Sequence, residues 1–248
     1  MITRTRPRTR PAESPPGDAG RRLRVLGGLA GIAGPVTFTA AWVVESLLQT
    51  GHAATQVQIS GLAAPDARDP WIMITGFLVL GGCSAVFGTA LNRELGGSVR
   101  TGRTGRARWA GRAGAGPRLI QVAGLLTAVA GLLRRDQMLL TAPAHESWHN
   151  HAHDVVSAVI YVALVVAPLL LARRFRGDPR WRALRWPLVG AGLVTAAVLV
   201  VFFTGAFSSS AGLLQRVGVS VPLAAVCAVA ARLLTLRREP QPRRQPRS

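Results

Sequence analysis

Histidines are concentrated in one short stretch of the chain, between residues 141 and 154. His145, His149 and His153 recur at intervals of four, which would place them on one face of a helix. Imidazoles one turn apart can both ligate a divalent metal, and a carboxylate such as Asp136 or Asp154 could complete the shell or orient a ring. This spacing makes His149, His153 and Asp136 the candidate ligands of a metal site, with Zn²⁺ as the candidate cofactor.

Two other interpretations of the same residues stay open. The stretch reads His149-Asn150-His151-Ala152-His153, so it lacks the glutamate that would follow the first histidine of a metalloprotease motif. The histidines and Asp136 could instead relay protons or sense pH. They could also form a purely structural network at the start of a helix, partly hydrated at the level of the lipid head groups.

Further polar residues near the ends of apolar runs are candidates for the same site. Ionisable groups at membrane depth are costly unless they are paired or hydrated, so we expect them to share a water-accessible pocket. Arg216 could neutralise Glu45 across the bundle or bind an anionic lipid group, and two adjacent arginines could extend outward from a short helix. The candidate pocket residues are Glu45, Ser60, Arg134, Arg135, Asp136, His145, Asp154 and Arg216.

Long apolar runs must position these residues. The chain combines 49% hydrophobic residues with a formal net charge of +19, and its basic residues gather in blocks between the apolar runs. Runs of about 20 residues are long enough to cross the hydrocarbon core as helices. We predict an all-α, polytopic membrane protein built as a bundle of six transmembrane helices, with spans at about 25–49, 71–91, 119–140, 151–171, 184–207 and 213–236.

The arginines predict which side of the membrane each end faces. Seven lie in residues 1–24, seven in a Gly/Arg-rich loop at 93–118 and six between residues 173 and 185, whereas the alternate connections have few or none. Short loops rich in positive charge tend to remain cytoplasmic. We therefore expect a multi-pass protein of the plasma membrane with both termini in the cytoplasm and the candidate pocket facing outward.

The composition also bears on partners. The tails 1–24 and 237–248 contain too little apolar surface to fold, so we expect them to be disordered and cytoplasmic. Because the basic blocks are terminal and interhelical, we expect the lipid bilayer and anionic lipid head groups as partners, and no nucleic acid. Cys83 and Cys227 lie inside apolar runs, where we expect free thiols. The oligomeric state stays open.

The order of these pieces resembles the domain-of-unknown-function family 998, six-span bacterial membrane proteins, from about Gly34 to Leu234. The features that carry the resemblance are Gly34-Pro35, Ile59-Ser60-Gly61-Leu62, Asp136, the pair His149 and His153 followed by Asp154, and Leu213-Leu214-Gln215-Arg216. The chain departs from the family's aspartate-proline after the third span, because Gln137 follows Asp136. The resemblance implies a fold and a membrane location but no activity.

The leading hypothesis for function is an outward-facing His/Asp/Arg pocket that binds an ion, a lipid head group or a partner. The alternative is a zinc-dependent membrane hydrolase in which the metal lowers the pKa of bound water. The serine, aspartate and histidines at helix ends are similar in type to the ligands of seven-span zinc hydrolases of the alkaline ceramidase type, although the span count differs. A proton-coupled transporter is the third hypothesis, and the sequence does not decide whether the protein is an enzyme.

Overall fold

The computed structural model describes residues 16–51, 53–100, 114–136 and 146–236. The described residues contain helices and no strands, which confirms the predicted all-α class. The elements are α1 (Pro16–Leu48), the short 3-10 helix η1 (Ile59–Ala63), α2 (Pro70–Arg100), α4 (Ala115–Leu132), α5 (Trp148–Phe175), η2 (Arg182–Leu184), α6 (Arg185–Thr204), η3 (Ser208–Ser210) and α7 (Ala211–Thr235).

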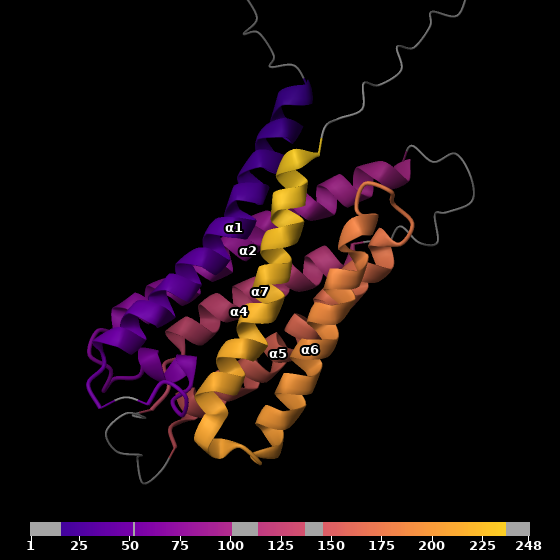
Figure 1. Ribbon diagram of the computed structural model, residues 1–248. Coiled ribbons are helices and arrows are strands. Elements are labelled where there is room, and N and C mark those ends of the chain that lie inside the picture. The colour runs from indigo at the N-terminus through magenta and orange to yellow at the C-terminus, as the bar shows by residue number, and fades with distance from the viewer. Residues whose placement is uncertain (1–15, 52, 101–113, 137–145, 237–248) are drawn as a thin grey trace, which may run out of the picture.

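The six long helices form a closed ring of antiparallel neighbours (Figure 1). Each packs against the next in the chain, and α7 packs back against α1. The bundle therefore has two ends. One end is called the basic end. It contains the start of α1, the α2–α4 and α5–α6 links and the end of α7. We call the other, with the links α1–α2, α4–α5 and α6–α7, the pocket end.

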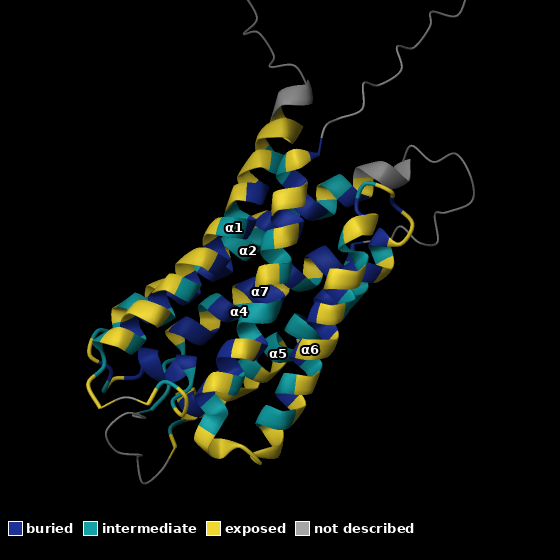
Figure 2. Ribbon diagram, viewed as in Figure 1, coloured by how far each residue is buried: buried dark blue, intermediate teal, exposed yellow. Residues whose placement is uncertain are grey.

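The outer faces of the helices are apolar. Six helices in the described residues are long and apolar enough to cross a membrane. Many large hydrophobic residues are exposed, and Figure 2 shows exposed residues, in yellow, along the outer sides of the helices. A helix that is apolar on both its inner and its outer face needs an apolar solvent. The chain is thus a multi-pass membrane protein with six transmembrane helices.

Several helix boundaries differ from those predicted. α1 begins at Pro16, so residues 16–24 are helical and not part of a disordered tail. α2 continues to Arg100, past the predicted end at about residue 91. α4 ends at Leu132, where residues up to 140 had been assigned to the span. The hydropathy pattern predicts where a segment leaves the lipid. A helix instead ends where its backbone hydrogen bonding ends, so the two boundaries need not coincide. The rest of the predicted tails lies outside the described residues.

Small residues set the spacing within the ring. A Cβ added at Gly31 of α1 would lie 2.7 Å from both Phe87 and Ala230, so this glycine brings α1 close to α2 and α7 at once. Membrane helices pack closely where small residues face one another, because no hydrophobic effect drives them together in lipid. Cys83 and Cys227 are both free thiols, as predicted.

Candidate functional site

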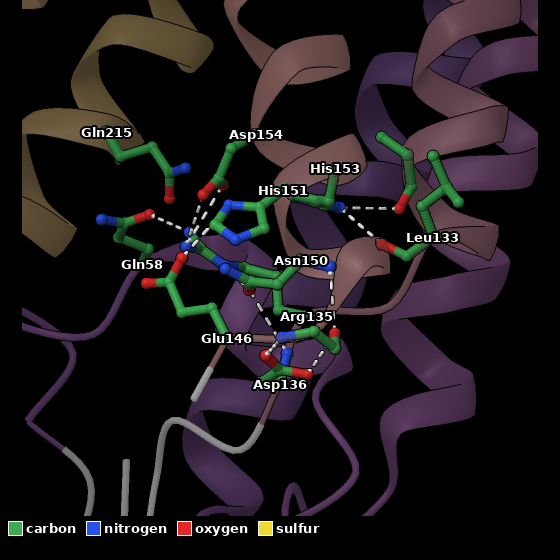
Figure 3. A network of polar contacts seen from close by, with 12 residues as sticks. Gln58, Leu133, Arg135, Asp136, Glu146, Asn150, His151, His153, Asp154 and Gln215 are labelled. Carbon is green, nitrogen blue, oxygen red and sulfur yellow. Dashed lines mark hydrogen bonds and ion pairs between the residues drawn. The ribbon is translucent and has the colours of Figure 1, made fainter. Parts of the chain in front are cut away.

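Arg135 is the centre of a polar network at the pocket end (Figure 3). Its Nε donates to Asn150 Oδ1 at 3.2 Å, and its Nη1 donates to Gln58 Oε1 at 3.0 Å. Its Nη2 pairs with the carboxylate of Asp154 at 3.2 Å. The guanidinium therefore joins the link after α4 to α5 and to the first link of the chain.

A cavity of about 260 Å³ lies beside this network. Arg135 and Asp154 contribute opposite charges, with side chains 15% and 46% exposed. Two aromatic residues of α6 and the tyrosine of α5 form an apolar wall. The full lining is Gln58, Ser60, Arg135, His153, Asp154, Ser157, Ala158, Tyr161, Phe202, Phe203 and Gln215. The cavity thus combines an ion pair, neutral hydrogen-bonding groups and aromatic rings.

Gln215 fixes the side of the cavity opposite Arg135. Its Nε2 donates to Tyr161 Oη at 2.6 Å, and its Oε1 accepts the backbone N–H of Ile59. These two contacts tie α7 to α5 and to the start of η1. Because Gln58 and Ile59 are adjacent, the first link is held by Arg135 on one side and by Gln215 on the other.

His153 is buried between α5 and the end of α4. Its ring nitrogen Nδ1 lies 2.9 Å from the Ala130 carbonyl oxygen and 2.7 Å from that of Leu133. A carbonyl can only accept, so Nδ1 donates to both. These carbonyls belong to the last turn of α4, where they lack helical partners. The side chain therefore closes the end of α4 with one edge and lines the cavity as well.

Asp136 holds the start of α5 in place. Its carboxylate accepts the Ser147 hydroxyl at 2.6 Å and the Ser147 backbone N–H at 2.7 Å. The hydroxyl and then the amide of Ser147 lower the pKa of Asp136. Ser147 in turn caps α5 by accepting the Asn150 N–H, and its oxygen lies 2.6 Å from His149 Nδ1. Because the serine proton points to Asp136, His149 donates this bond.

The predicted metal ligands do not converge. His149 lies on the exposed start of α5 with Asp136 and Ser147, whereas His153 is turned toward α4. Among the described residues, no group of three His, Cys, Asp or Glu side chains could hold a metal ion. His145 lies outside the described residues. Zinc binding therefore stays a prediction, without a ligand set in the part of the chain that the structure describes.

Glu45 and Arg216 occupy separate networks near the first link. Glu45 is fully buried and accepts bonds from Gln49 Nε2 and, at 3.2 Å, from the Asp69 backbone N–H. Arg216 donates to backbone carbonyls of Ala54, Val57 and Gly212 and to Ser46 Oγ. No ion pair joins Glu45 to Arg216 among the described residues, so the expected salt bridge is not formed. Both residues fasten the first link.

The remaining candidates divide in the same way. Arg134 donates to the Ala63 carbonyl at 3.2 Å and thereby holds η1, whereas its neighbour Arg135 points to α5. Ser60 is buried in η1 and lines the cavity. The structure thus brings Ser60, Arg135, His153 and Asp154 together, and it assigns Glu45, Arg134, Asp136 and Arg216 to contacts that shape the surrounding links.

Several lining residues were missed by the sequence analysis. Ser157 and Tyr161 follow the predicted Asp154 at helical spacing along α5, which places all three on one stripe. The predicted histidines lie on a neighbouring stripe, and histidines are the commoner metal ligands. Tyr161 is the only tyrosine in the chain and stands in an apolar run, which is a usable signal. Gln215 is a lone amide in an apolar helix, and it too could have been found.

Comparison with known proteins gives one match. A family model described as "Protein of unknown function (DUF998)" matches residues 32–232, which is most of the chain. No curated protein matches the sequence, and no solved structure matches the fold. The matched range includes every described residue of the cavity.

Proposed function

The chain belongs to the DUF998 family of proteins of unknown function, and from this premise we propose that its cavity binds the zwitterionic head group of a membrane phospholipid. One observation carries the proposal. The same cavity is lined by the Arg135–Asp154 ion pair and by Phe203 of α6, whose side chain is 62% exposed on the outer surface of the bundle. A charged site bordered by an exposed apolar side chain fits an amphiphile.

The ion pair matches the charges of a zwitterion. A guanidinium recognises phosphate through several N–H groups arranged in a fixed fork. The contacts of Arg135 with Asn150, Gln58 and Asp154 do not use all the N–H groups of a guanidinium, so donors remain for a phosphate. Asp154 can accept hydrogen bonds from the cationic end of the ligand. A bound zwitterion would therefore satisfy both charges.

The size of the cavity limits the ligand to a head group. Its volume of about 260 Å³ lies below the range of roughly 300–1,000 Å³ that is typical for drug-sized ligands. The acyl chains of a lipid would have to remain outside. Phe203 lies on the last turns of α6, where its ring leads from the cavity to the exposed apolar side of that helix. The chains could then follow α6 within the bilayer.

The orientation in the membrane is part of the proposal. The arginine distribution favours cytoplasmic termini and a plasma-membrane location, with the pocket end facing outward. The arginine blocks of the basic end would then meet the anionic lipids of the cytoplasmic leaflet. A reporter fused after residue 248 tests this orientation: activity of a cytoplasm-specific reporter supports it, and activity of a periplasm-specific reporter contradicts it.

Lipid binding is tested with the full chain purified in detergent. Native mass spectrometry would follow a titration with dioleoyl phosphatidylethanolamine, and the soluble glycerophosphoethanolamine in a second series. We expect Arg135→Gln to weaken lipid binding about ten-fold, since it removes a charge-assisted bond. His151→Gln is the matched control, because this exposed residue pairs with Glu146 outside the cavity.

The two series distinguish the sources of the ligand. Binding of the lipid but not of the soluble head group places the natural ligand in the membrane. Equal binding of both identifies a soluble zwitterion as sufficient. Binding of the lipid that is unchanged in Arg135→Gln contradicts the proposed site.

A further inference from the structure

His153 has a proton position that its surroundings fix. Nδ1 lies within hydrogen-bond distance of two carbonyl oxygens, those of Ala130 and Leu133, and these can only accept. In a neutral imidazole one nitrogen carries the proton and the other is an acceptor. The proton is therefore on Nδ1, and Nε2 has a lone pair without a proton.

The acceptor edge of this ring lies on the cavity side. The ring is 3% exposed and its Nδ1 edge is held against the end of α4, as Figure 3 shows for the contact with Leu133. The same residue lines the cavity between α5, α6 and α7, so its remaining edge faces that space. Asp154, the next residue in α5, supplies carboxylate oxygens to the same cavity.

We propose that His153 Nε2 and the Asp154 carboxylate select head groups that carry N–H donors beside a phosphate, so that the cavity takes phosphoethanolamine and discriminates against phosphocholine. This inference rests on the proposed function and adds the ligand class. Arg135 is the donor for the phosphate, and the two neighbouring acceptors are left for the ammonium. A trimethylammonium group has no N–H, so it leaves His153 Nε2 without a donor and Asp154 with only its contact to Arg135.

The aromatic wall gives the opposite preference, which makes the selection testable. Tyr161, Phe202 and Phe203 line the same cavity. Aromatic faces attract quaternary ammonium groups through cation–π interactions. If these rings dominate, choline is bound at least as tightly as ethanolamine. If the acceptors dominate, affinity falls with each methyl group on the nitrogen.

The experiment compares chain-matched lipids on the purified full chain. Dioleoyl phosphatidylethanolamine, its N-methyl and N,N-dimethyl derivatives and dioleoyl phosphatidylcholine are titrated and followed by native mass spectrometry. We expect affinity to decrease along the series, with about a ten-fold difference between its ends, because the buried His153 loses the donor to its acceptor nitrogen. Equal affinities along the series, or a preference for choline, overturn the inference. Absence of binding for every lipid instead contradicts the proposed function.

A single variant separates the acceptor from the structural role of the ring. In His153→Asn the side-chain amide can still donate to the carbonyls at the end of α4, but no acceptor remains at the position of Nε2. We expect the ratio of ethanolamine to choline affinity to fall about five-fold, with unchanged affinity for choline. His151→Asn is the matched control on the same helix, and its ratio should equal that of the wild type. If His153→Asn does not fold, the methylation series on the wild type still decides the question.

Discussion

Both ends of the bundle contain an arginine bound to one or two carboxylates, and the network at the pocket end lies beside a cavity. At the basic end, Arg180 donates to Asp178 and, at 3.1 Å, to Glu94. Trp181, next in the chain, is fully buried and stacks on Phe175 with ring centres 4.7 Å apart. At the pocket end, Arg135 makes similar contacts around a space of about 260 Å³.

The difference lies in what fills the space beside the charges. The indole of Trp181 is fully buried. It stacks on Phe175 within the hydrophobic core, and the contacts of Arg180, the preceding residue, hold Asp178 and Glu94. No side chain of comparable size fills the cavity beside Arg135. An arginine–carboxylate pair can receive a ligand only where the adjacent volume is open, as it is beside Arg135.

Removing the filler at the basic end should have the largest effect. Trp181→Ala should lower the free energy of unfolding by about 3–5 kcal/mol, because a large buried aromatic side chain is replaced by a cavity. Unfolding in detergent followed by circular dichroism measures the change. Trp186→Ala is the matched control, since that indole is exposed on the outside of α6. A similar loss in both variants would show that Trp181 is not a special filler.

At the pocket end, Arg216 holds the first link by hydrogen bonds to backbone carbonyls. Arg216→Met should cost roughly 2–3 kcal/mol, because it leaves partly or fully buried carbonyls of Ala54, Val57 and Gly212 without this donor. Faster proteolysis of the first link should accompany the loss. Arg68→Met in the same link serves as the control, as its contacts are exposed. Equal protease resistance of wild type and Arg216→Met would disprove the anchoring role.

The same Arg→Gln substitution at each end should affect ligand binding at one end and stability at the other. Arg135→Gln should weaken phosphatidylethanolamine binding about ten-fold, with a loss of stability below about 1 kcal/mol. Arg180→Gln should leave binding unchanged and cost about 1 kcal/mol, a value kept low because that side chain is one-third exposed. Lipid titration and thermal unfolding of both variants measure this. The comparison fails if both variants affect the same quantity.

Acid should weaken both ends slightly. Burial raises the pKa of Asp178, but the hydrogen bonds and charge of Arg180 outweigh it and hold the pKa below its usual range. The Ser147 bonds do the same for Asp136. A carboxyl whose pKa is lowered on folding stabilises the fold above the unfolded value of about 3.9 and loses this contribution as pH falls through the folded value. We expect melting temperatures to be constant above about pH 5 and to fall below about pH 4.

Variants that replace one carboxylate by an amide show which aspartate causes the loss of stability in acid. Asp178→Asn and Asp136→Asn should each give a melting temperature that depends less on pH below 4 than that of the wild type. The variant Asp66→Asn is a control in the first link of the chain. Curves for Asp178→Asn and Asp136→Asn that run parallel to the wild-type curve would contradict the assignment.

Much of the fold could be predicted because each membrane helix corresponds to one continuous apolar segment of the sequence. Each apolar run must satisfy its own peptide groups in lipid, so length and hydropathy suffice to predict six spans. The ends were less well placed. α4 ends at Leu132, and carbonyls at this end bind His153, a residue far along the chain. No local pattern contains that contact.

The site was predicted only in part for the same reason. Arg135, Asp154 and His153 could be chosen from residue type alone, because charges and histidines are rare in apolar segments. Their division into separate networks could not. Arg134 and Arg135 are neighbours with the same side chain, yet one binds the Ala63 carbonyl and the other binds Asn150, Gln58 and Asp154.

The sequence by itself determined that this protein lies in a membrane and how many times it crosses it. Each apolar segment is long enough to span the lipid independently of the others. Only the tertiary structure decided which polar residues share a space. That choice depends on how six helices close into a ring and on which side chain fills each gap between them. Packing is a property of the whole assembly, so the open volume beside Arg135 and the packed rings of Phe175 and Trp181 follow from tertiary contacts.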